Sequence, residues 1–259
     1  MNSPRMDSAR IAAQARAAQD IDIEVLEQTG STNADLLARV ATLSRPLLLA
    51  ARHQTAGRGR AGRSWLSEAG GSLTFSLAWR FDGGVARLIG LPLAIGVALA
   101  DAMAALDVPV QLKWPNDLER DGAKLAGILI ETAAAGTATW AVIGIGINLA
   151  LPDDLEAVIG RPIANATWLA RMDRDQLMAT LLDSLCATLR EFDRDGLPAF
   201  VARWNARHAY QDKPVAISDG SAVLHQGIAR GIDRHGRLLL DVAGQEVAIV
   251  AGDVSLRGA

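Results

Sequence analysis

The segment QTAGRGRAGRSWLSEAGGSLTFSLAWR, residues 54–80, decides which fold the chain can adopt. Its glycines and arginines fit the G-x-G-x-x-G motif of dinucleotide-binding folds and, with Arg63 in place of lysine, come close to a phosphate-binding P-loop. Both motifs require that the loop opens a helix. The residues that follow contain Gly70 and Gly71 and then alternate in a period of two, which predicts a strand from Ser72 to Arg80. We therefore favour neither of these two folds.

The loop within this segment still has the chemistry of an anion site. Arg58, Arg60 and Arg63 place three guanidinium groups within six residues, and small residues between them let backbone N–H groups approach a ligand. Such a loop can bind a phosphorylated or carboxylated molecule. Taken alone, it leaves two alternatives open: a solvated basic loop, or an arginine and glycine contact to nucleic acid.

Length and composition indicate a soluble globular protein. The chain has 259 residues, of which 50% are hydrophobic and 21% charged, and this excludes collagen-like, disordered and low-complexity classes. The formal net charge is −3, so any site for a polyanion must be local. The single cysteine, Cys186, excludes an internal disulfide framework and a cysteine-based zinc site, which fits a reducing cytoplasm.

Hydrophobic patterns divide the chain into segments. Residues 1–20 read as a polar N-terminal lead-in without the apolar segment of a secretory signal. Residues 21–210 alternate strand and helix patterns. The apolar stretch 88–106 contains a proline and an aspartate and predicts a core helix rather than a membrane span. In residues 211–259, short apolar runs are separated by glycine turns, which is typical of a small barrel.

Lysine is rare, since Lys113, Lys124 and Lys213 stand among 26 basic residues. In so arginine-rich a chain, a lysine suggests a need for a compact, flexible charge at a phosphate or carboxylate, with a chance surface lysine as the alternative. Asn116 and Asp117 follow a proline turn at a strand end, a common place for site residues, although Asn-Asp is also ordinary turn chemistry. The histidines lack metal-ligand spacing, and no G-x-S-x-G elbow is present, so hydrolase and zinc-enzyme functions are disfavoured.

Five segments taken together resemble the biotin protein ligases. They are TGSTN (29–33), QTAGRGRAGRSW (54–65), KWPND (113–117), KLAGILIE (124–131) and GIGIN (144–148), and the likeness extends from about Ile21 to Arg257. The resemblance implies an α+β protein: a catalytic domain related to the class II aminoacyl-tRNA synthetases, with a mixed sheet and flanking helices, followed by a small C-terminal SH3-like β-barrel. The short lead-in leaves too little chain for an N-terminal helix-turn-helix, so the ligase-only form is expected.

The resemblance also implies a two-step reaction. Biotin and ATP give biotinyl-5′-adenylate and pyrophosphate, and the adenylate then modifies one lysine on the biotin carboxyl carrier domain of acetyl-CoA carboxylase or a related carboxylase. Biotin and ATP are then the substrates and Mg²⁺ is the activating ion, and no tightly bound prosthetic group is expected. We expect a cytoplasmic enzyme that binds neither DNA nor membranes, and a weak homodimer is compatible with this. The alternatives are a lipoate-type protein ligase and a non-catalytic biotin- or nucleotide-binding protein.

Residue roles follow from the resemblance together with the chemistry of the substrates. Catalysis is assigned to Lys124, Arg60 and Asp117. Trp65 and Trp114 are expected to wall an apolar pocket, and no metal ligand is named. Biotin binding is assigned to Ser31, Thr32, Asn33, Gln54, Arg58, Gly59, Arg60, Lys124, Gly127, Leu129 and Gly144. ATP binding is assigned to Arg58, Arg63, Trp65, Lys113, Asn116, Asn148 and Arg257.

Overall fold

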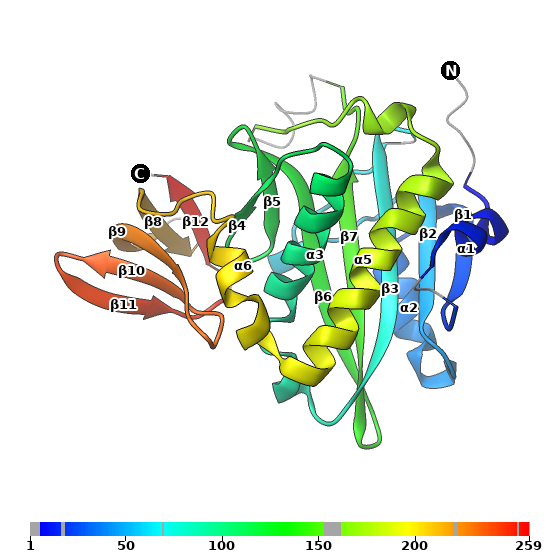
Figure 1. Cartoon of the computed structure of the whole chain (residues 1–259), viewed down its shortest axis with the longest axis horizontal. Coiled ribbons are helices and arrows are strands. Elements are labelled where there is room, and N and C mark those ends of the chain that lie inside the picture. Colours follow the sequence, from blue (N-terminus) through cyan, green and yellow to red (C-terminus); the bar gives the residue numbers. More distant parts are fainter. Residues whose placement is uncertain are drawn as a thin grey trace.

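A seven-stranded sheet forms the larger part of the protein (Figure 1). The computed structural model describes residues 6–16, 19–68, 70–152, 162–219, 222–252 and 254–258. The strand order is β1-β2-β3-β7-β6-β5-β4; β1 pairs with β2 in parallel and the other pairs are antiparallel, so the sheet is mixed. The strands are β1 (Asp22–Thr29), β2 (Leu47–Gln54), β3 (Ser72–Asp82), β4 (Gln111–Lys113), β5 (Asp117–Arg120), β6 (Ala123–Ala135) and β7 (Ala138–Asn148).

Both faces of this sheet are covered by helices. On β7, Ile143, Ile145 and Ile147 belong to the core beneath α3 (Leu91–Ala105) and α5 (Arg174–Asp195), which lie side by side across one face (Figure 1). Trp140 and Val142 alternate with them and pack against α2 (Thr32–Arg39) on the other face. Since successive strand residues point to opposite faces, a strand that is apolar on both sides needs two covering layers.

Helix α3 is a core helix, as predicted. The segment Val85–Ala105 is long and apolar enough to cross a membrane, but 67% of its apolar window lies buried inside the protein. Leu91, Ile95 and Leu99 are fully buried, and so are residues on the other sides of the helix. Its apolarity is therefore explained by packing against the sheet, α5 and α6 (Val201–Asn205).

The predicted lead-in contains a helix that joins the main core. Asp7 is the N-cap of helix α1 (Ser8–Gln14), and its side chain accepts a hydrogen bond from the Arg10 backbone N–H. Ile11 is fully buried in the core, and the Asp7 backbone N–H donates to Asp175 Oδ1 of α5 at 2.8 Å. Ile11 and the small Ala15 are the buried side chains in the described part of this segment, and they give little sequence signal, which is why the segment reads as polar.

The C-terminal part is a five-stranded antiparallel sheet in the order β11-β10-β9-β8-β12, consistent with the expected SH3-like barrel. It packs on the end of the large sheet, and Trp114 donates its Nε1–H to the carbonyl of Gly236 at 3.1 Å. Trp114 is 1% exposed and lines no described cavity, so the expectation that it walls a pocket was wrong. The strands are β8 (Pro214–Asp219), β9 (Ala222–Ile232), β10 (Leu238–Val242), β11 (Gln245–Ile249) and β12 (Ser255–Gly258).

Candidate active site

A cavity of about 670 Å³ opens where the α2 face of the sheet changes from large to small residues. Along β7, Trp140 and Val142 are followed on the same face by Gly144 and Gly146. On the neighbouring strand β3, Ser76 and Thr74 lie opposite these two glycines, and both line the cavity with short polar side chains. The strand sequences therefore produce the cavity. Large strand side chains fill the space between α2 and the sheet, and past the N-terminus of α2 the strands β3 and β7 carry no such large side chains on this face.

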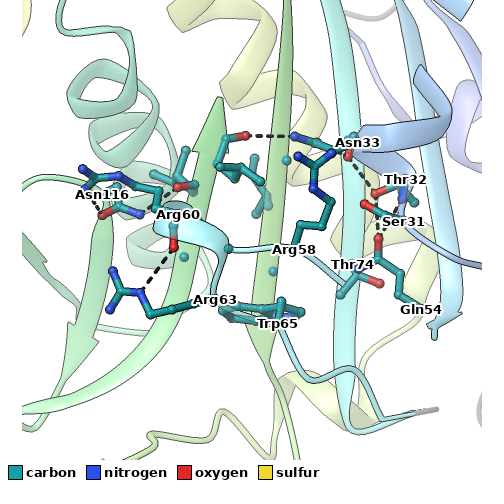
Figure 2. Close-up of a pocket in the computed structure, with 18 of the residues that line it drawn as sticks. Ser31, Thr32, Asn33, Gln54, Arg58, Arg60, Arg63, Trp65, Thr74 and Asn116 are labelled. Carbon is teal, nitrogen blue, oxygen red and sulfur yellow. Dashed lines mark hydrogen bonds between the residues drawn. The ribbon is translucent and has the colours of Figure 1, made fainter. Parts of the chain in front are cut away.

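One wall of the cavity is a buried network of neutral polar groups. Gln54 Oε1 accepts from the backbone N–H of Thr32 at 2.8 Å. The Thr32 and Ser76 hydroxyl oxygens lie 2.7 Å apart, and Ser76 Oγ donates to Asn33 Oδ1 at 2.6 Å. Ser31 is the N-cap of α2, and its hydroxyl accepts from the Ala34 backbone N–H. These groups are at most 9% exposed, so their mutual hydrogen bonds hold them in fixed orientations (Figure 2).

Two glycines in this wall cannot be replaced without moving a neighbour. A Cβ on Gly144 would lie 2.4 Å from Asn33 Oδ1, and a Cβ on Gly146 would lie 2.3 Å from Trp65 Cε2. Both approaches are closer than carbon contacts allow. The glycines of GIGIN therefore serve close packing of site residues against the strand rather than a bulge, since β7 pairs with both neighbours in unbroken register through these positions.

The arginine loop folds back on itself beside the cavity. The Gly59 backbone N–H donates to the Arg63 carbonyl at 2.7 Å, and the Trp65 backbone N–H donates to Gly57 at 2.9 Å. Ala61 has φ of 53° and the next residue also has a positive φ, so the chain turns sharply there. A single short 3₁₀ turn, Arg60–Gly62, is present in place of the long helix that a phosphate-binding loop would need. This confirms that the loop belongs to neither fold considered at first.

The arginines of the loop are tied to other parts of the site by ion pairs and hydrogen bonds. Arg58 Nη2 donates to Glu131 Oε1 at 2.8 Å. Arg60 donates to Asn116 Oδ1 at 2.9 Å (Figure 2), and it also donates to the carbonyl of Gly252, which lies in the C-terminal part. Arg60 therefore connects three segments that are far apart in sequence: the loop, the KWPND turn and the barrel.

The predicted catalytic lysine lies in the same cavity. Lys124 Nζ donates to Asp117 Oδ1, and the side chains of the pair are 13% and 17% exposed. The ammonium also lies 5.7 Å from the centre of the Trp65 ring, within the range of a cation–π contact. Asp117 pairs with Gly127 in the β5–β6 hairpin, and the Lys124 side chain reaches over Gly127, where its ammonium meets the carboxylate. A partly desolvated ammonium is thereby held at the cavity beside a carboxylate.

The sequence and the fold both match known proteins. Residues 25–148 match the Biotin/lipoate A/B protein ligase family, and residues 212–257 match the Biotin protein ligase C terminal domain. The chain is 39% identical to the bifunctional ligase/repressor BirA of Escherichia coli over 92% of its own length and 74% of that protein. It is 35% identical to the biotin–[acetyl-CoA-carboxylase] ligase of Paracoccus denitrificans over 90% of its length and 100% of that protein.

The chain belongs to the biotin protein ligase family. A biotin protein ligase from Aquifex aeolicus, solved in complex with biotin and ATP, superposes with a TM-score of 0.76 at 26% identity, over 92% of this chain and 99% of that one. The resemblance seen in the sequence motifs is thus confirmed, and so is the expected combination of a mixed-sheet domain with a C-terminal barrel.

The structure brings together most of the residues to which the family resemblance assigned roles. Every residue assigned to biotin lines the main cavity, as do Arg58, Arg63, Trp65 and Asn116 of the ATP set and Asp117. Their individual roles stay predictions.

Three residues of the ATP set lie outside the main cavity. Asn148 lines a second hollow of about 360 Å³ on the other side of Trp65, and its Nδ2 donates to the Lys124 carbonyl at 3.0 Å. Arg257 is exposed on β12. Lys113 Nζ pairs with buried Glu119 at 2.7 Å; burial lowers the pKa of Lys113, but the hydrogen bond and charge of Glu119 outweigh this and raise it. The roles of these three residues also stay predictions.

Sequence reasoning missed several residues of the site. Thr74 and Ser76 line the cavity from β3, and the signal for them was the alternation in SLTFSLAWR, which places both on the face shared with Ala78. Glu131 ends the KLAGILIE motif and binds Arg58 and Asn33, but no local pattern distinguishes it from a surface glutamate.

The described residues contain no group of three or more His, Cys, Asp or Glu side chains placed to hold a metal ion. In the main cavity, the carboxylate of Asp117 is paired with Lys124. Magnesium in nucleotide enzymes is usually held by one or two carboxylates together with substrate phosphates. The residues present therefore suit an ion that enters with a nucleotide better than one held by a dedicated protein cage.

Proposed function

We propose that this chain activates biotin with ATP and transfers the biotinyl group to a lysine of a carboxylase biotin carrier domain. The observation that carries the proposal is the junction, inside one cavity, of a neutral hydrogen-bonding wall with a cationic side that contains Lys124 and the arginine loop. The biotin and ATP held by the Aquifex relative support the same substrates.

The neutral wall suits the ureido ring of biotin. That ring is uncharged and has both donors and acceptors, so it needs fixed hydroxyl and amide partners rather than ions. Thr32, Asn33, Gln54 and Ser76 provide them from buried positions. Leu129, Gly127 and Trp65 line the same cavity as Lys124. They suit the apolar tail of biotin, and Lys124 suits the carboxylate at the end of that tail.

In the first step, a biotin carboxylate oxygen attacks the α-phosphorus of ATP, the bond from that phosphorus to the bridging oxygen breaks, and pyrophosphate leaves. Attacking and attacked groups are both anionic, so positive charge must lie between them. We assign this role to Lys124, and we assign the phosphate side to Arg60 and Arg63, which line the same cavity. Magnesium supplies further charge neutralisation when bound with the nucleotide.

In the second step, the amine of the carrier lysine attacks the acyl carbon of the adenylate, AMP leaves, and the amine loses a proton. The amine of a lysine ordinarily has a pKa of about 10.4, so it is protonated near neutral pH. A nearby base therefore assists the attack. Asp117 is our candidate for orienting the amine and accepting its proton. Because Asp117 pairs with Lys124, this role requires that the adenylate draws Lys124 away from it.

The organisation and setting of the protein are parts of the same proposal. We assign residues 21–210 to the catalytic domain, 211–259 to the barrel and 1–20 to a lead-in. We propose a cytoplasmic enzyme whose partner is the carrier domain, with Mg²⁺ as the activating ion, no tightly bound prosthetic group, no affinity for DNA or membranes, and at most a weak homodimer.

Pyrophosphate release in the presence of ATP and Mg²⁺ tests the proposal. The purified protein is given biotin, lipoate or no acid, and the adenylate is identified by mass spectrometry. We expect release with biotin only, followed by labelling of one lysine when a carrier domain is added. Equal release with lipoate would favour the lipoate-ligase alternative, and biotin binding without any release would favour the non-catalytic one.

A further inference from the structure

Glu131 joins the two sides of the cavity. It lies on the cavity face of β6, between Leu129 and Ala133, and its side chain is 23% exposed. One carboxylate oxygen accepts from Arg58 Nη2 at 2.8 Å, and the other accepts from Asn33 Nδ2 at 3.0 Å. A single carboxylate therefore contacts the arginine loop and the neutral wall at once.

The bond to Asn33 fixes the direction of an amide in the neutral wall. A carboxylate only accepts hydrogen bonds, so the amide nitrogen of Asn33 must face Glu131. The amide oxygen then faces the strand, where it accepts from Ser76 Oγ at 2.6 Å. Asn33 is 3% exposed, so no solvent contact competes for this choice. The same nitrogen donates more weakly to the Leu129 carbonyl at 3.4 Å, so Glu131 is the stronger of two acceptors that determine which hydrogen-bonding groups the wall presents.

The bond to Arg58 ties the start of the arginine loop to the same wall. Arg58 pairs across the loop with Ser64, so a restraint on Arg58 restrains both arms of the turn. The far side of the turn is tied separately, through Arg60 to Asn116. The loop therefore has one anchor at the predicted ureido end of the cavity and another near the predicted phosphates.

We infer that Glu131 is a positioning residue that latches the arginine loop onto the biotin wall through Arg58 while it orients Asn33. This inference rests on the proposed function. Loss of the carboxylate loosens the loop and leaves the Asn33 amide nitrogen with the weaker contact to the Leu129 carbonyl at 3.4 Å, so the amide is held less firmly, the site binds biotin less well and the loop opens more often. An ordinary structural ion pair in its place would affect stability without selecting biotin over ATP.

Protease sensitivity tests the latch without any catalysis. Trypsin cleaves after arginine, so the early rate of cleavage after Arg58, Arg60 and Arg63 measures loop opening. We expect Glu131→Gln to raise these rates about three- to tenfold, the scale of one partly exposed ion pair together with one charge-assisted hydrogen bond. Cleavage after Arg234, in the exposed turn between β9 and β10, should stay unchanged.

A matched control is available at Glu24. Its carboxylate accepts two hydrogen bonds from Arg39, each 2.7 Å long. Glu24 lies on β1, far from the arginine loop in sequence. Glu24→Gln should leave loop cleavage at the wild-type rate. An unchanged loop rate in Glu131→Gln, or an equal rise in the control or at Arg234, overturns the latch.

Steady-state kinetics test the link to biotin. In Glu131→Gln we expect KM for biotin to rise about three- to tenfold and KM for ATP to stay within about twofold. Arg58→Gln should raise KM for biotin by a similar factor, and the double variant should raise it no further than the larger of the two single effects. Equal rises in both KM values contradict the inference. Absence of biotin-dependent pyrophosphate release in the wild type would refute the proposed function instead, and the protease result would still decide whether Glu131 restrains the loop.

Discussion

The two sides of the cavity differ in how their side chains are held in place. The neutral wall consists of short side chains that are at most 9% exposed and that satisfy one another, as Gln54 does with Thr32 and Ser76 does with Asn33. The cationic side consists of long side chains whose partners are ions and carbonyls, and Arg58 is 48% exposed in its ion pair. One side is fixed by burial, whereas the other is held by contacts that a charged substrate can replace.

This contrast indicates a division of work. A buried network that is already satisfied recognises a neutral ring by shape and by the direction of its hydrogen bonds, and it changes little on binding. Exposed ion pairs contribute little to stability, so their exchange for substrate carboxylate and phosphates costs little. Changes in the neutral wall should therefore affect biotin binding, and changes on the cationic side, apart from the Arg58 contact that is tied to the wall through Glu131, should affect the chemical steps.

The largest effect is expected for Lys124→Ala. It removes the cation that lies between two anionic reactants, and loss of one such group lowers the rate of adenylate formation by about 10²–10⁴-fold. Pyrophosphate release measures this, and circular dichroism checks the fold. Lys213→Ala is the matched control, because Lys213 donates to the Ala209 carbonyl outside the cavity. Near-normal adenylate synthesis in a folded Lys124→Ala protein would remove Lys124 from the mechanism.

Asp117→Asn should slow transfer more than activation. We expect transfer from preformed biotinyl-adenylate to the carrier to fall about 10²-fold, the lower end of the effect of a positioned base. Raising the pH should partly restore transfer, because more of the acceptor amine is then neutral. Asp22→Asn, at an exposed ion pair with Arg45, serves as the control. Equal losses in both steps without rescue by pH would show that Asp117 acts only in binding or structure.

Gly144→Ala tests the neutral wall. Its added methyl group would lie 2.4 Å from Asn33 Oδ1 and must displace that amide. Overpacking of this kind changes an equilibrium by about five- to hundredfold, and we expect the change in the Kd for biotin. Gly84→Ala is the control, since a Cβ there meets no atom within 4 Å. Unchanged biotin affinity would mean that the wall is more adaptable than its burial indicates.

The smallest effect on rate is expected for Arg60→Gly. Arg60 bonds to Asn116 and to Gly252, so its loss frees the turn of the loop from the barrel. We expect biotinyl-adenylate to escape about two- to tenfold faster, with a smaller change in its synthesis. Biotinylation of a bystander protein such as albumin reports the escape. Strict carrier specificity in Arg60→Gly would contradict this role.

The sequence allowed the prediction of the fold and of most of the cavity for identifiable reasons. The alternation after residue 72 excludes a helix behind the arginine loop, and the small residues of GIGIN mark a close approach to strand backbone. Trp114 was misplaced because its position within KWPND does not show which way its side chain faces in the β4–β5 turn. Glu131 was missed because its partners come from residues 33 and 58, and only the folded sheet brings them together.

The division of work between the two sides is tested most directly by calorimetric titration with biotinamide, in which a neutral carboxamide replaces the carboxylate. The ligand keeps the ureido ring and loses the group that would meet Lys124. We predict equal affinity for the wild type and Lys124→Ala, and a loss of affinity of about five- to hundredfold for Gly144→Ala. Weakening by Lys124→Ala as large as that by Gly144→Ala would contradict the account, because binding of the neutral ring would then depend on the cationic side.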